Sequence, residues 1–334
     1  MPSGFVSAGN WIIDHVKLIH AWPSEETLSN ILSEYKGTGG APYNVLLGLR
    51  TFDSSIPLTG VGVIGNDADG DFIENDLRTR NIDFHLRRSA ELPTSYTDVM
   101  TVQSTGRRTF FHNRGGNAEF VPNDIPWDRL EGRYFHFGYL LLLDAMDADD
   151  AEYGTPAARV LATARSKGMI TSVDVVSESG DRFARISRPA LPHTDLLICN
   201  EIEAGRIAGV ELRPGGVFAR NRLREVAEKL LGMGVNLGVV IHAAEGGYTL
   251  MKTGEEAYQP SLKLPPGYIA GGAGAGDAFC AGFLYGTHED WPLQRRLLLA
   301  VCAAAANLSD PTCTGGIRGL DETLELGIMY RPEG

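Results

Sequence analysis

The sequence predicts an α/β protein in which a mostly parallel β-sheet is covered by helices on both faces. Short apolar runs typical of buried strands alternate along the chain with longer runs that have helical periodicity. Alternation of this kind is typical of strand–helix–strand units, which build parallel sheets. The 334 residues are enough for one large α/β domain, and no internal repeat or low-complexity linker divides them.

The strand candidates are short and apolar. They cover residues 5–8, 58–64, 134–137, 170–175, 195–199 and 238–241. The helix candidates cover residues 43–49, 70–80, 157–167, 220–233 and 292–308. The last of these contains the longest apolar run, residues 297–306, which is too short to span a bilayer and predicts a buried helix.

Two segments, at about residues 14–37 and 92–117, break this alternation and look extended and partly polar. Within the second, residues 97–102 and 108–113 form a candidate hairpin. A hairpin that cannot bury its second face in the main sheet is a candidate lid, and the alternative is an edge extension of the same sheet. An uncovered hairpin also suggests a homodimer formed through the lid.

Composition narrows the class of protein. The net charge of −12 argues against nucleic acid as a partner, because nucleic acid needs a basic face. No Cys-x-x-Cys pair occurs among the cysteines, which favours a reducing compartment over a disulfide framework or a zinc site. They are Cys199, Cys280, Cys302 and Cys313. Because the N-terminus has no signal-peptide pattern, we expect a cytoplasmic protein without a membrane partner.

The most informative stretch, residues 271–279, combines glycine and alanine with one carboxylate and the start of an apolar helical pattern. Glycine allows close approach of the backbone, and the N–H groups and dipole of a helix start bind anions such as phosphate. Asp277 is better suited there to take a proton from a group that attacks the phosphate than to bind the phosphate itself. The pattern indicates phosphoryl transfer to a hydroxyl, although an N-capping aspartate after turn glycines would look the same.

Other motifs are absent or misleading. The chain has no Gly-Lys dipeptide, hence no Walker A loop, and no Gly-x-Ser-x-Gly, His-Glu-x-x-His or His-Arg-Asp motif. Residues 60–65 match Gly-x-Gly-x-x-Gly, but this segment is itself apolar and no clean strand precedes it. We expect a buried strand that leads into a turn, and a dehydrogenase is a distant alternative.

Taken in order, these motifs resemble the PfkB (ribokinase-like) family of carbohydrate and nucleoside kinases, over about residues 4–317. The most specific match is to the C-terminal signature of the family, at residues 274–279 with Gly282. The weaker matches are Gly9, Asp14, Gly39, Gly40, Asn44, Gly62, Gly65, Asp67, Gly70, Asn200 and Glu203. The resemblance implies a single kinase domain over residues 1–334, a three-layer α/β/α sandwich with a small β-strand lid.

The resemblance also implies a catalytic centre. Asp277 would be the general base that deprotonates the acceptor hydroxyl as it attacks the γ-phosphate of ATP. The backbone of Gly274, Ala275 and Gly276 would form the anion hole for the charge that develops on the phosphoryl oxygens. Phosphoryl transfer needs little covalent chemistry from the protein, so positioning and electrostatics would dominate.

Further residues would bind the substrates by the same resemblance. Asn200 and Glu203 would organise Mg²⁺ through water, without direct metal ligands, and Gly246 would contact the nucleotide. The alternative for Asn200 and Glu203 is a helix cap plus a surface carboxylate, and for Asp14 an ordinary loop aspartate. The residues expected to hold the acceptor are Asp14, Gly39, Gly40 and Asn44. Lid residues that are weaker candidates for substrate contacts are His112, Asn113, Arg114 and Asn117.

The chain departs from the family pattern in two places. Gly271 and Gly272 stand where the family usually has Asp-Thr, and because that aspartate often supports a monovalent-cation site, K⁺ activation is in doubt. The nucleotide loop usually reads Thr-x-Gly-x-x-Gly, but residues 241–246 retain only Gly246. His242 either replaces a lost hydroxyl contact or is an ordinary loop histidine, and we favour the second interpretation.

The leading hypothesis is an ATP- and Mg²⁺-dependent kinase of a small carbohydrate: a pentose, a hexose or a keto-deoxy sugar acid. One alternative is a nucleoside kinase of the same family, for which aromatic residues near the lid leave room. They are Tyr43, Tyr96, Phe110 and Phe111. Another is a ligand-binding protein with little turnover, although such a protein has no use for Asp277. The acidic run at residues 144–152 is expected to be solvated and without chemistry.

Overall fold

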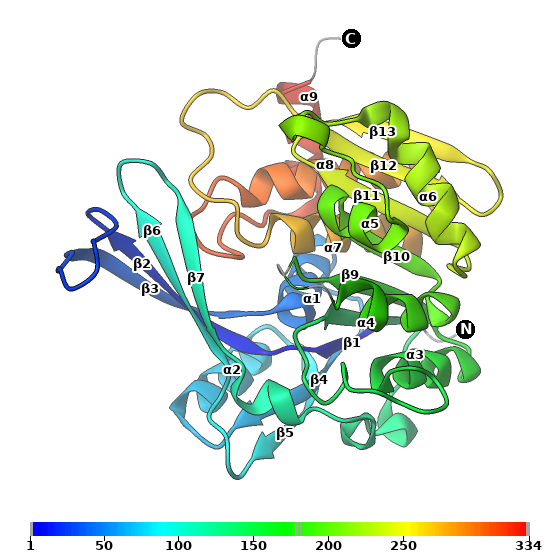
Figure 1. Cartoon of the computed structure of the whole chain (residues 1–334), viewed down its shortest axis with the longest axis horizontal. Helices are drawn as coiled ribbons and strands as arrows, with labels where there is room; N and C mark the ends of the chain where they lie inside the picture. The colour runs from blue at the N-terminus through cyan, green and yellow to red at the C-terminus, as the bar shows by residue number, and fades with distance from the viewer. Residues whose placement is uncertain (1–2, 178–179, 181, 332–334) are drawn as a thin grey trace.

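The computed structural model describes residues 3–177, 180 and 182–331 (Figure 1). Within them, the main body is a nine-stranded sheet with helices on both faces. In spatial order its strands are β13 (Glu256–Pro260), β12 (Gly246–Met251), β11 (Gly238–Ala243), β10 (Leu196–Asn200), β9 (Ile170–Val175), β8 (Tyr134–Leu140), β1 (Phe5–Gly9), β4 (Leu58–Gly65) and β5 (Asp83–Ser89). All neighbours from β5 to β11 are parallel, and β12 and β13 extend the sheet in antiparallel fashion.

Two hydrophobic clusters, one on each face of this sheet, create the three layers. One face is covered by α3 (Pro156–Ser166), α4 (Phe183–Ala190), α5 (Glu201–Ala208) and α6 (Leu223–Gly232). The other is covered by α1 (Ala41–Phe52), α2 (Ala68–Thr79), α7 (Ala275–His288), α8 (Leu293–Asn307) and α9 (Leu320–Met329). In β1, Val6 and Ala8 belong to the first cluster and Phe5 to the second. Burial on both faces explains why the strands are continuous apolar runs.

A second, four-stranded sheet stands apart from these layers, at the left of Figure 1. Its strands are β3 (Ile31–Gly39), β2 (Ile12–Ile19), β6 (Tyr96–Val102) and β7 (Arg108–Asn113), in that order. β2 and β6 are parallel, whereas β3 and β7 pair with them in antiparallel fashion. The two extended segments predicted from the sequence therefore combine in one small sheet. The alternative of an edge extension of the main sheet is wrong.

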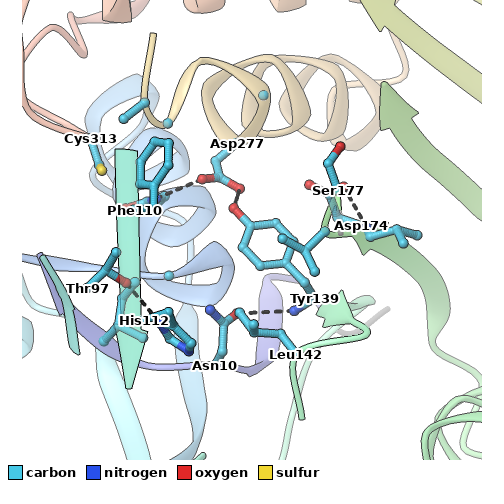
Figure 2. Close-up of a pocket in the computed structure, with 18 of the residues that line it drawn as sticks. Asn10, Thr97, Phe110, His112, Tyr139, Leu142, Asp174, Ser177, Asp277 and Cys313 are labelled. Carbon is cyan, nitrogen blue, oxygen red and sulfur yellow. Dashed lines mark hydrogen bonds between the residues drawn. The ribbon is translucent and has the colours of Figure 1, made fainter. Parts of the chain in front are cut away.

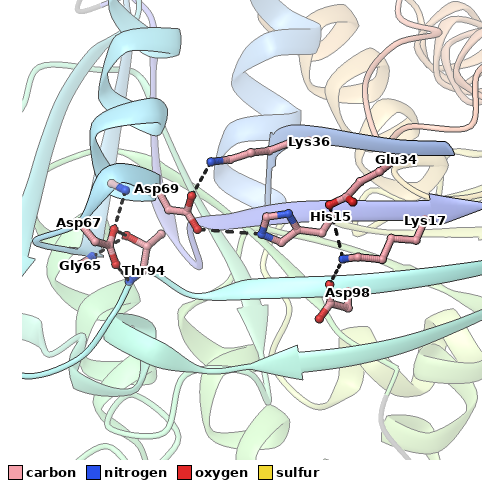
Figure 3. A network of polar contacts seen from close by, with 10 residues as sticks. His15, Lys17, Glu34, Lys36, Gly65, Asp67, Asp69, Thr94 and Asp98 are labelled. Carbon is pink, nitrogen blue, oxygen red and sulfur yellow. Dashed lines mark hydrogen bonds and ion pairs between the residues drawn. The ribbon is translucent and has the colours of Figure 1, made fainter. Parts of the chain in front are cut away.

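A polar network joins this lid sheet to the main body (Figure 3). Asp67 caps α2 through the N–H of Gly70 at 2.8 Å, and its carboxylate also accepts from the N–H and hydroxyl of Thr94, at 2.7 and 2.6 Å. The hydroxyl of Thr94 in turn accepts from the N–H of Gly65 at 2.9 Å. Three of the weaker family matches, Gly65, Asp67 and Gly70, therefore hold the start of the second lid segment in place.

The root of the lid is fixed by Trp11, which is fully buried between β1 and β2. Its indole N–H donates to the carbonyl of Val61 at 2.9 Å, and a side chain at Gly60 or Gly62 would overlap its ring. Asn117 accepts from the backbone N–H of Trp11 at 3.1 Å and donates to its carbonyl at 3.0 Å. The Gly-x-Gly-x-x-Gly pattern is thus part of a buried strand that accommodates an indole, as the sequence predicts, and it does not open a helix.

Several elements were not predicted from the sequence, among them β5, β12, β13, α4, α5 and α9. Short 3₁₀ turns cover Gly115–Glu119, Pro122–Asp124, Trp127–Arg129, Leu191–His193, Pro214–Gly216 and Arg220–Arg222. The expectation for residues 144–152 is wrong at Asp147, which is buried and accepts from the N–H groups of Leu141 and Leu143 at 3.0 and 3.1 Å. Among the described residues, every helix is too short or too polar to cross a membrane.

Candidate active site

A cavity of about 700 Å³ lies at the carboxyl ends of the central strands, between the main sheet and the lid. Its volume is in the range of small-molecule sites, and its position is the one at which open α/β sheets bind ligands. Figure 2 shows lid residues Thr97, Phe110 and His112 on one side of it and Asp174 with Ser177 on the other. Asp277 projects between these two groups.

Asp277 is held by hydrogen bonds to both of its carboxylate oxygens. The hydroxyl of Tyr139, on β8, donates to Oδ1 at 2.6 Å (Figure 2). The Nδ2 of Asn44, on α1, donates to Oδ2 at 2.7 Å. Burial raises the pKa of Asp277, and the two donors counteract part of that rise because they stabilise the ionised form. Each carboxylate oxygen can accept a second hydrogen bond, so the clamp leaves Asp277 able to accept a proton from a bound hydroxyl.

The loop before Asp277 presents backbone donors to the cavity. Gly274 is the N-cap of α7 and has a φ of 73°, in the left-handed region that favours glycine. The first helical bond joins the N–H of Ala278 to the carbonyl of Gly274 at 2.9 Å, so the N–H groups of residues 275–277 precede it. Gly274 and Gly276 line the cavity. The predicted anion hole and the predicted base therefore share one helix start.

Of the acceptor residues predicted from the sequence, Asp14, Gly40 and Asn44 line the same cavity, and Gly39 lies directly against Asp14. Asp14, on β2, is buried, and its Oδ2 has no hydrogen-bond partner among the described residues. Burial raises the pKa of Asp14 to about 6, against the opposing effect of a hydrogen bond from the Cys313 thiol. Gly39 has no room for a side chain because a Cβ would overlap Oδ2 of Asp14, and Gly40 packs equally closely on the carbonyl of Asn10. A buried carboxylate oxygen without a donor suits a ligand hydroxyl.

The four lid candidates divide into two pairs. His112 and Arg114 line the cavity. The Nδ1 of His112 lies 2.9 Å from the hydroxyl of Thr97, and its Nε2 is buried without a partner among the described residues. Asn113 instead accepts from the N–H of Gly115 at 2.9 Å, and Asn117 holds the backbone of Trp11. Neither Asn113 nor Asn117 lines the cavity.

Opposite the lid, an acidic group surrounds the start of α5. Asn200 caps this helix through the N–H groups of Ile202 and Glu203, and Glu203 accepts from the N–H of Asn200 at 2.9 Å. Glu203 also accepts from the hydroxyl of Ser177 at 2.7 Å. Asn200 is thus a helix cap, as the alternative interpretation of the sequence expects. Glu203 is buried, so it is not the surface carboxylate of that interpretation.

Burial raises the pKa of Glu203 to about 7. It also raises the pKa of the buried Asp174, with smaller contributions from Glu203 and Asp277. Among the described residues, no group of three acidic, histidine or cysteine side chains is arranged to ligate a metal directly. The role of Asn200 and Glu203 in holding Mg²⁺ through water therefore stays a prediction.

The predicted nucleotide residues fall on β11 and β12. His242 is not a loop residue: it lies in β11, packs against Phe279 with ring centroids 5.1 Å apart, and would touch a Cβ at Gly276. It lines the cavity, and burial lowers its pKa to about 4, so the imidazole is neutral at pH 7. Gly246 begins β12 and does not line this cavity, so its nucleotide role remains a prediction.

Sequence reasoning missed three polar residues at the site. Asn10 directly follows β1 and accepts from the N–H of Tyr139 at 3.1 Å, while its Nδ2 is buried without a partner among the described residues. Asp174 belongs to a predicted strand. The signal for Asn10 and Asp174 was their place at the carboxyl ends of β1 and β9, the two parallel strands on either side of β8. Tyr139 lies near the carboxyl end of β8, but it was missed because the strand predicted from the sequence covered only residues 134–137.

The site combines three features: the open start of α7, the buried carboxylate of Asp277 beside it and the buried carboxylate of Asp14 at the lid. Together they are typical of a phosphotransferase with an alcohol acceptor. The family comparison gives the same class, because the model of the pfkB family carbohydrate kinases matches residues 6–318. The chain belongs to this family and is an ATP-dependent carbohydrate kinase. The predicted family and fold class are confirmed.

The chain is similar to the 5-dehydro-2-deoxygluconokinase of Geobacillus kaustophilus, with 24% identity in an alignment of 341 residues that covers 99% of this chain and 95% of the relative. It is also 24% identical to the ATP-dependent ribose-1-phosphate kinase of Halopiger xanaduensis, over 90% of each chain. A solved ribokinase from Thermotoga maritima matches with a TM-score of 0.78 at 18% identity, over 97% of this chain and 99% of that one. This last likeness concerns the fold.

Proposed function

We propose that this kinase transfers the γ-phosphate of ATP to a hydroxyl of a small carbohydrate, with Asp277 as the general base. The observation that carries the proposal is the joint placement of Asp277 and the open N–H groups of residues 275–277 at one helix start inside the cavity. A base positioned in this way contributes about 10²- to 10⁴-fold to the rate. The backbone N–H groups of Ala275, Gly276 and Asp277, which follow the N-cap Gly274, stabilise the charge that develops on the phosphoryl group.

The acceptor binds between Asp14 and the glycines of the β3–α1 turn. The unpartnered Oδ2 of Asp14 accepts a hydrogen bond from a sugar hydroxyl. The unpartnered Nδ2 of Asn10 donates a hydrogen bond to a second sugar oxygen. Gly39 and Gly40 leave the floor of this subsite free of side chains. These polar groups suit a pentose, a hexose or a keto-deoxy sugar acid, and the kinase from Geobacillus kaustophilus is named for an acid of the last kind.

Mg²⁺ fits the opposite end of the cavity. The pKa values of Glu203 and Asp174 are raised there, so a cation would relieve the crowding of negative charge. We propose that Asn200 and Glu203 hold the ion through its water ligands, and that the bound ion neutralises charge on the ATP phosphates. Gly246 and the turn between β11 and β12 that precedes it contact the nucleotide outside the part of the cavity described above.

The test is ADP release with Mg-ATP over a panel of sugars, sugar acids and nucleosides. Asp277→Asn should lower turnover by at least about a hundredfold, because it removes the base. Asp149→Asn, the same change at an exposed aspartate outside the cavity, is the matched control. Calorimetry should show that Asp277→Asn still binds ATP. Unchanged turnover in Asp277→Asn would refute the base assignment.

The same panel decides between sugar and nucleoside acceptors. Of the four aromatic residues considered for a base pocket, Phe110 lines the cavity. Tyr43 is buried and donates to Asp76, and Phe111 stacks on Trp22 with centroids 6.0 Å apart. One aromatic face is a weak basis for a nucleobase site, which favours sugars. Turnover with nucleosides alone would reverse this choice, and none with any acceptor would favour a binding protein.

The lid also supports a homodimer. Several of its large apolar side chains are about half exposed or more, which is unusual for a sheet that faces only water. They include Trp22, Leu28, Ile31, Tyr35 and Phe111. We propose that a second copy covers them, and Phe111→Asp should then shift sedimentation from dimer to monomer. The cytoplasmic location and the absence of a nucleic-acid partner remain predictions from composition.

A further inference from the structure

Strand β7 of the lid faces the cavity with alternate side chains. Phe110 and His112 line the cavity, and Arg108, two residues before Phe110, shares their face of the strand. Arg108 extends beyond the cavity to Gly271, in the loop that precedes α7, and to the loop between α8 and α9. Its Nη2 donates to the carbonyl oxygen of Pro311 at 3.0 Å. One strand therefore touches both the acceptor space and the surroundings of the phosphate-binding loop.

The guanidinium of Arg108 occupies the space that a side chain at Gly271 would fill. A Cβ built at Gly271 would overlap Nη2 and lie 2.8 Å from Cζ of Arg108. The neighbouring Gly272 differs, because a Cβ there meets no atom within 4 Å. Docking of Arg108 thus requires glycine at position 271 and is indifferent to a methyl group at position 272.

The segment that receives Arg108 continues directly into the site. Two residues after Pro311, the carbonyl oxygen of Cys313 packs so closely on Gly274 that a Cβ on this glycine would overlap it. Cys313 also lines the cavity beside Asp14. Contacts therefore run from Arg108 through residues 311–313 to the N-cap of α7 and to the acceptor aspartate.

The docked arginine is held weakly. Arg108 has no ion pair among the described residues, and its Nη1 is buried there without a hydrogen-bond partner. Burial lowers the pKa of its guanidinium, the opposite of what a carboxylate partner would do. Because one carbonyl bond offsets only part of the cost of burying a charge, the docked state is easily reversed.

We propose that Arg108 is a positioning residue that fastens the lid to the phosphate-binding loop, with Gly271 as its receptor. An acceptor that engages Phe110 and His112 on the same strand then favours the docked state, and docking fixes residues 311–313 against Gly274. The kinetic part of this proposal rests on the proposed function. The mechanical part, which is that Arg108 fastens the lid to the loop, is independent of the proposed function.

Hydrogen–deuterium exchange of β6 and β7 tests the mechanical part without any turnover. Arg108→Ala should speed exchange by roughly tenfold, the loss expected for a hydrogen bond from a charged donor. Gly271→Ala should speed it similarly, and Gly272→Ala should leave it unchanged. The double variant Arg108→Ala/Gly271→Ala should be no faster than Arg108→Ala alone, since both changes abolish the same contact.

Two results would overturn the proposed fastening of the lid by Arg108. One is an unchanged rate of hydrogen–deuterium exchange in Arg108→Ala, and the other is an equal effect of alanine at positions 271 and 272. Arg108→Ala needs no rearrangement of the loop, so it remains informative if Gly271→Ala fails to fold. Kinetically, Arg108→Ala should lower kcat/KM for the acceptor roughly tenfold while calorimetric ATP affinity stays unchanged. If the chain had no kinase activity, the proposed function would be wrong. The hydrogen–deuterium exchange result would still test whether Arg108 fastens the lid to the loop.

Discussion

Replacement of Tyr139 by phenylalanine should move the acid limb of the pH–rate profile to higher pH. The hydroxyl of Tyr139 donates to Asp277 at 2.6 Å and stabilises the carboxylate form, so its loss raises the pKa of the base further above its usual value. The aromatic ring stays, and packing in the cavity changes little. Asn44 still holds the other oxygen at 2.7 Å.

The size of the shift follows from the bond that is lost. A hydrogen bond to a charged group contributes about 1.5–3 kcal/mol, and each pKa unit corresponds to about 1.4 kcal/mol. The acid limb should therefore move by about one to two pH units, while the rate on the alkaline side of the limb falls little. The assay is kcat/KM for the acceptor against pH at saturating ATP, which reports the pKa of the base in the enzyme free of acceptor.

Tyr248→Phe is the matched control, because Tyr248 donates to Glu256 at the same 2.6 Å but lies outside the cavity. It should leave the limb in place. An unmoved limb in Tyr139→Phe would refute the assignment of Tyr139 as a donor that tunes the base. A faster reaction at every pH would mean that Tyr139 competes with the acceptor for Asp277.

Three further outcomes are expected. Glu203→Gln should raise the Mg²⁺ concentration for half-maximal rate by about 10-fold or more, measured by Mg²⁺ titration of ADP release, since it weakens the outer contacts of the ion. Exchange of Na⁺ for K⁺ should leave turnover unchanged, because Gly271 lacks the aspartate that supports a monovalent site and Arg108 fills the adjacent space. Burial lowers the pKa of His136 from 6.5 to about 3, so the unfolded chain binds the extra proton. Stability should fall as pH drops between these values, by up to about 1.4 kcal/mol per pH unit, and thermal melts of His136→Leu should show a shallower decline.

Much of the main sheet could be predicted because its central strands are buried on both faces. Runs such as 238–241 have no polar interruption, and the structure confirms them as strands. β5 was missed because its residues are mostly only partly buried and include two arginines, so its pattern is not that of a core strand. β12 and β13 were missed because antiparallel strands near the sheet edge carry glycine and polar residues.

The site was predicted where chemistry is written in consecutive residues. Gly274, Ala275, Gly276 and Asp277 are neighbours in sequence, so their shared role is visible without a fold. The clamp on Asp277 is different, because Asn44 and Tyr139 lie 233 and 138 residues away and meet it only through packing of α1 and β8 against α7. The docking of Arg108 at Gly271 likewise depends on how far the lid reaches, which no local pattern encodes.

The immobile Trp11 limits how this enzyme can open. Its indole is bonded to Val61 of β4, and its backbone N–H and carbonyl are both bonded to Asn117, so the residue that leads directly into β2 is held on three sides. Rotation of the whole lid as a rigid flap about its base is therefore costly. Access for a sugar must come from flexing of the far ends of β6 and β7, where a short outward bend is enough to free one guanidinium.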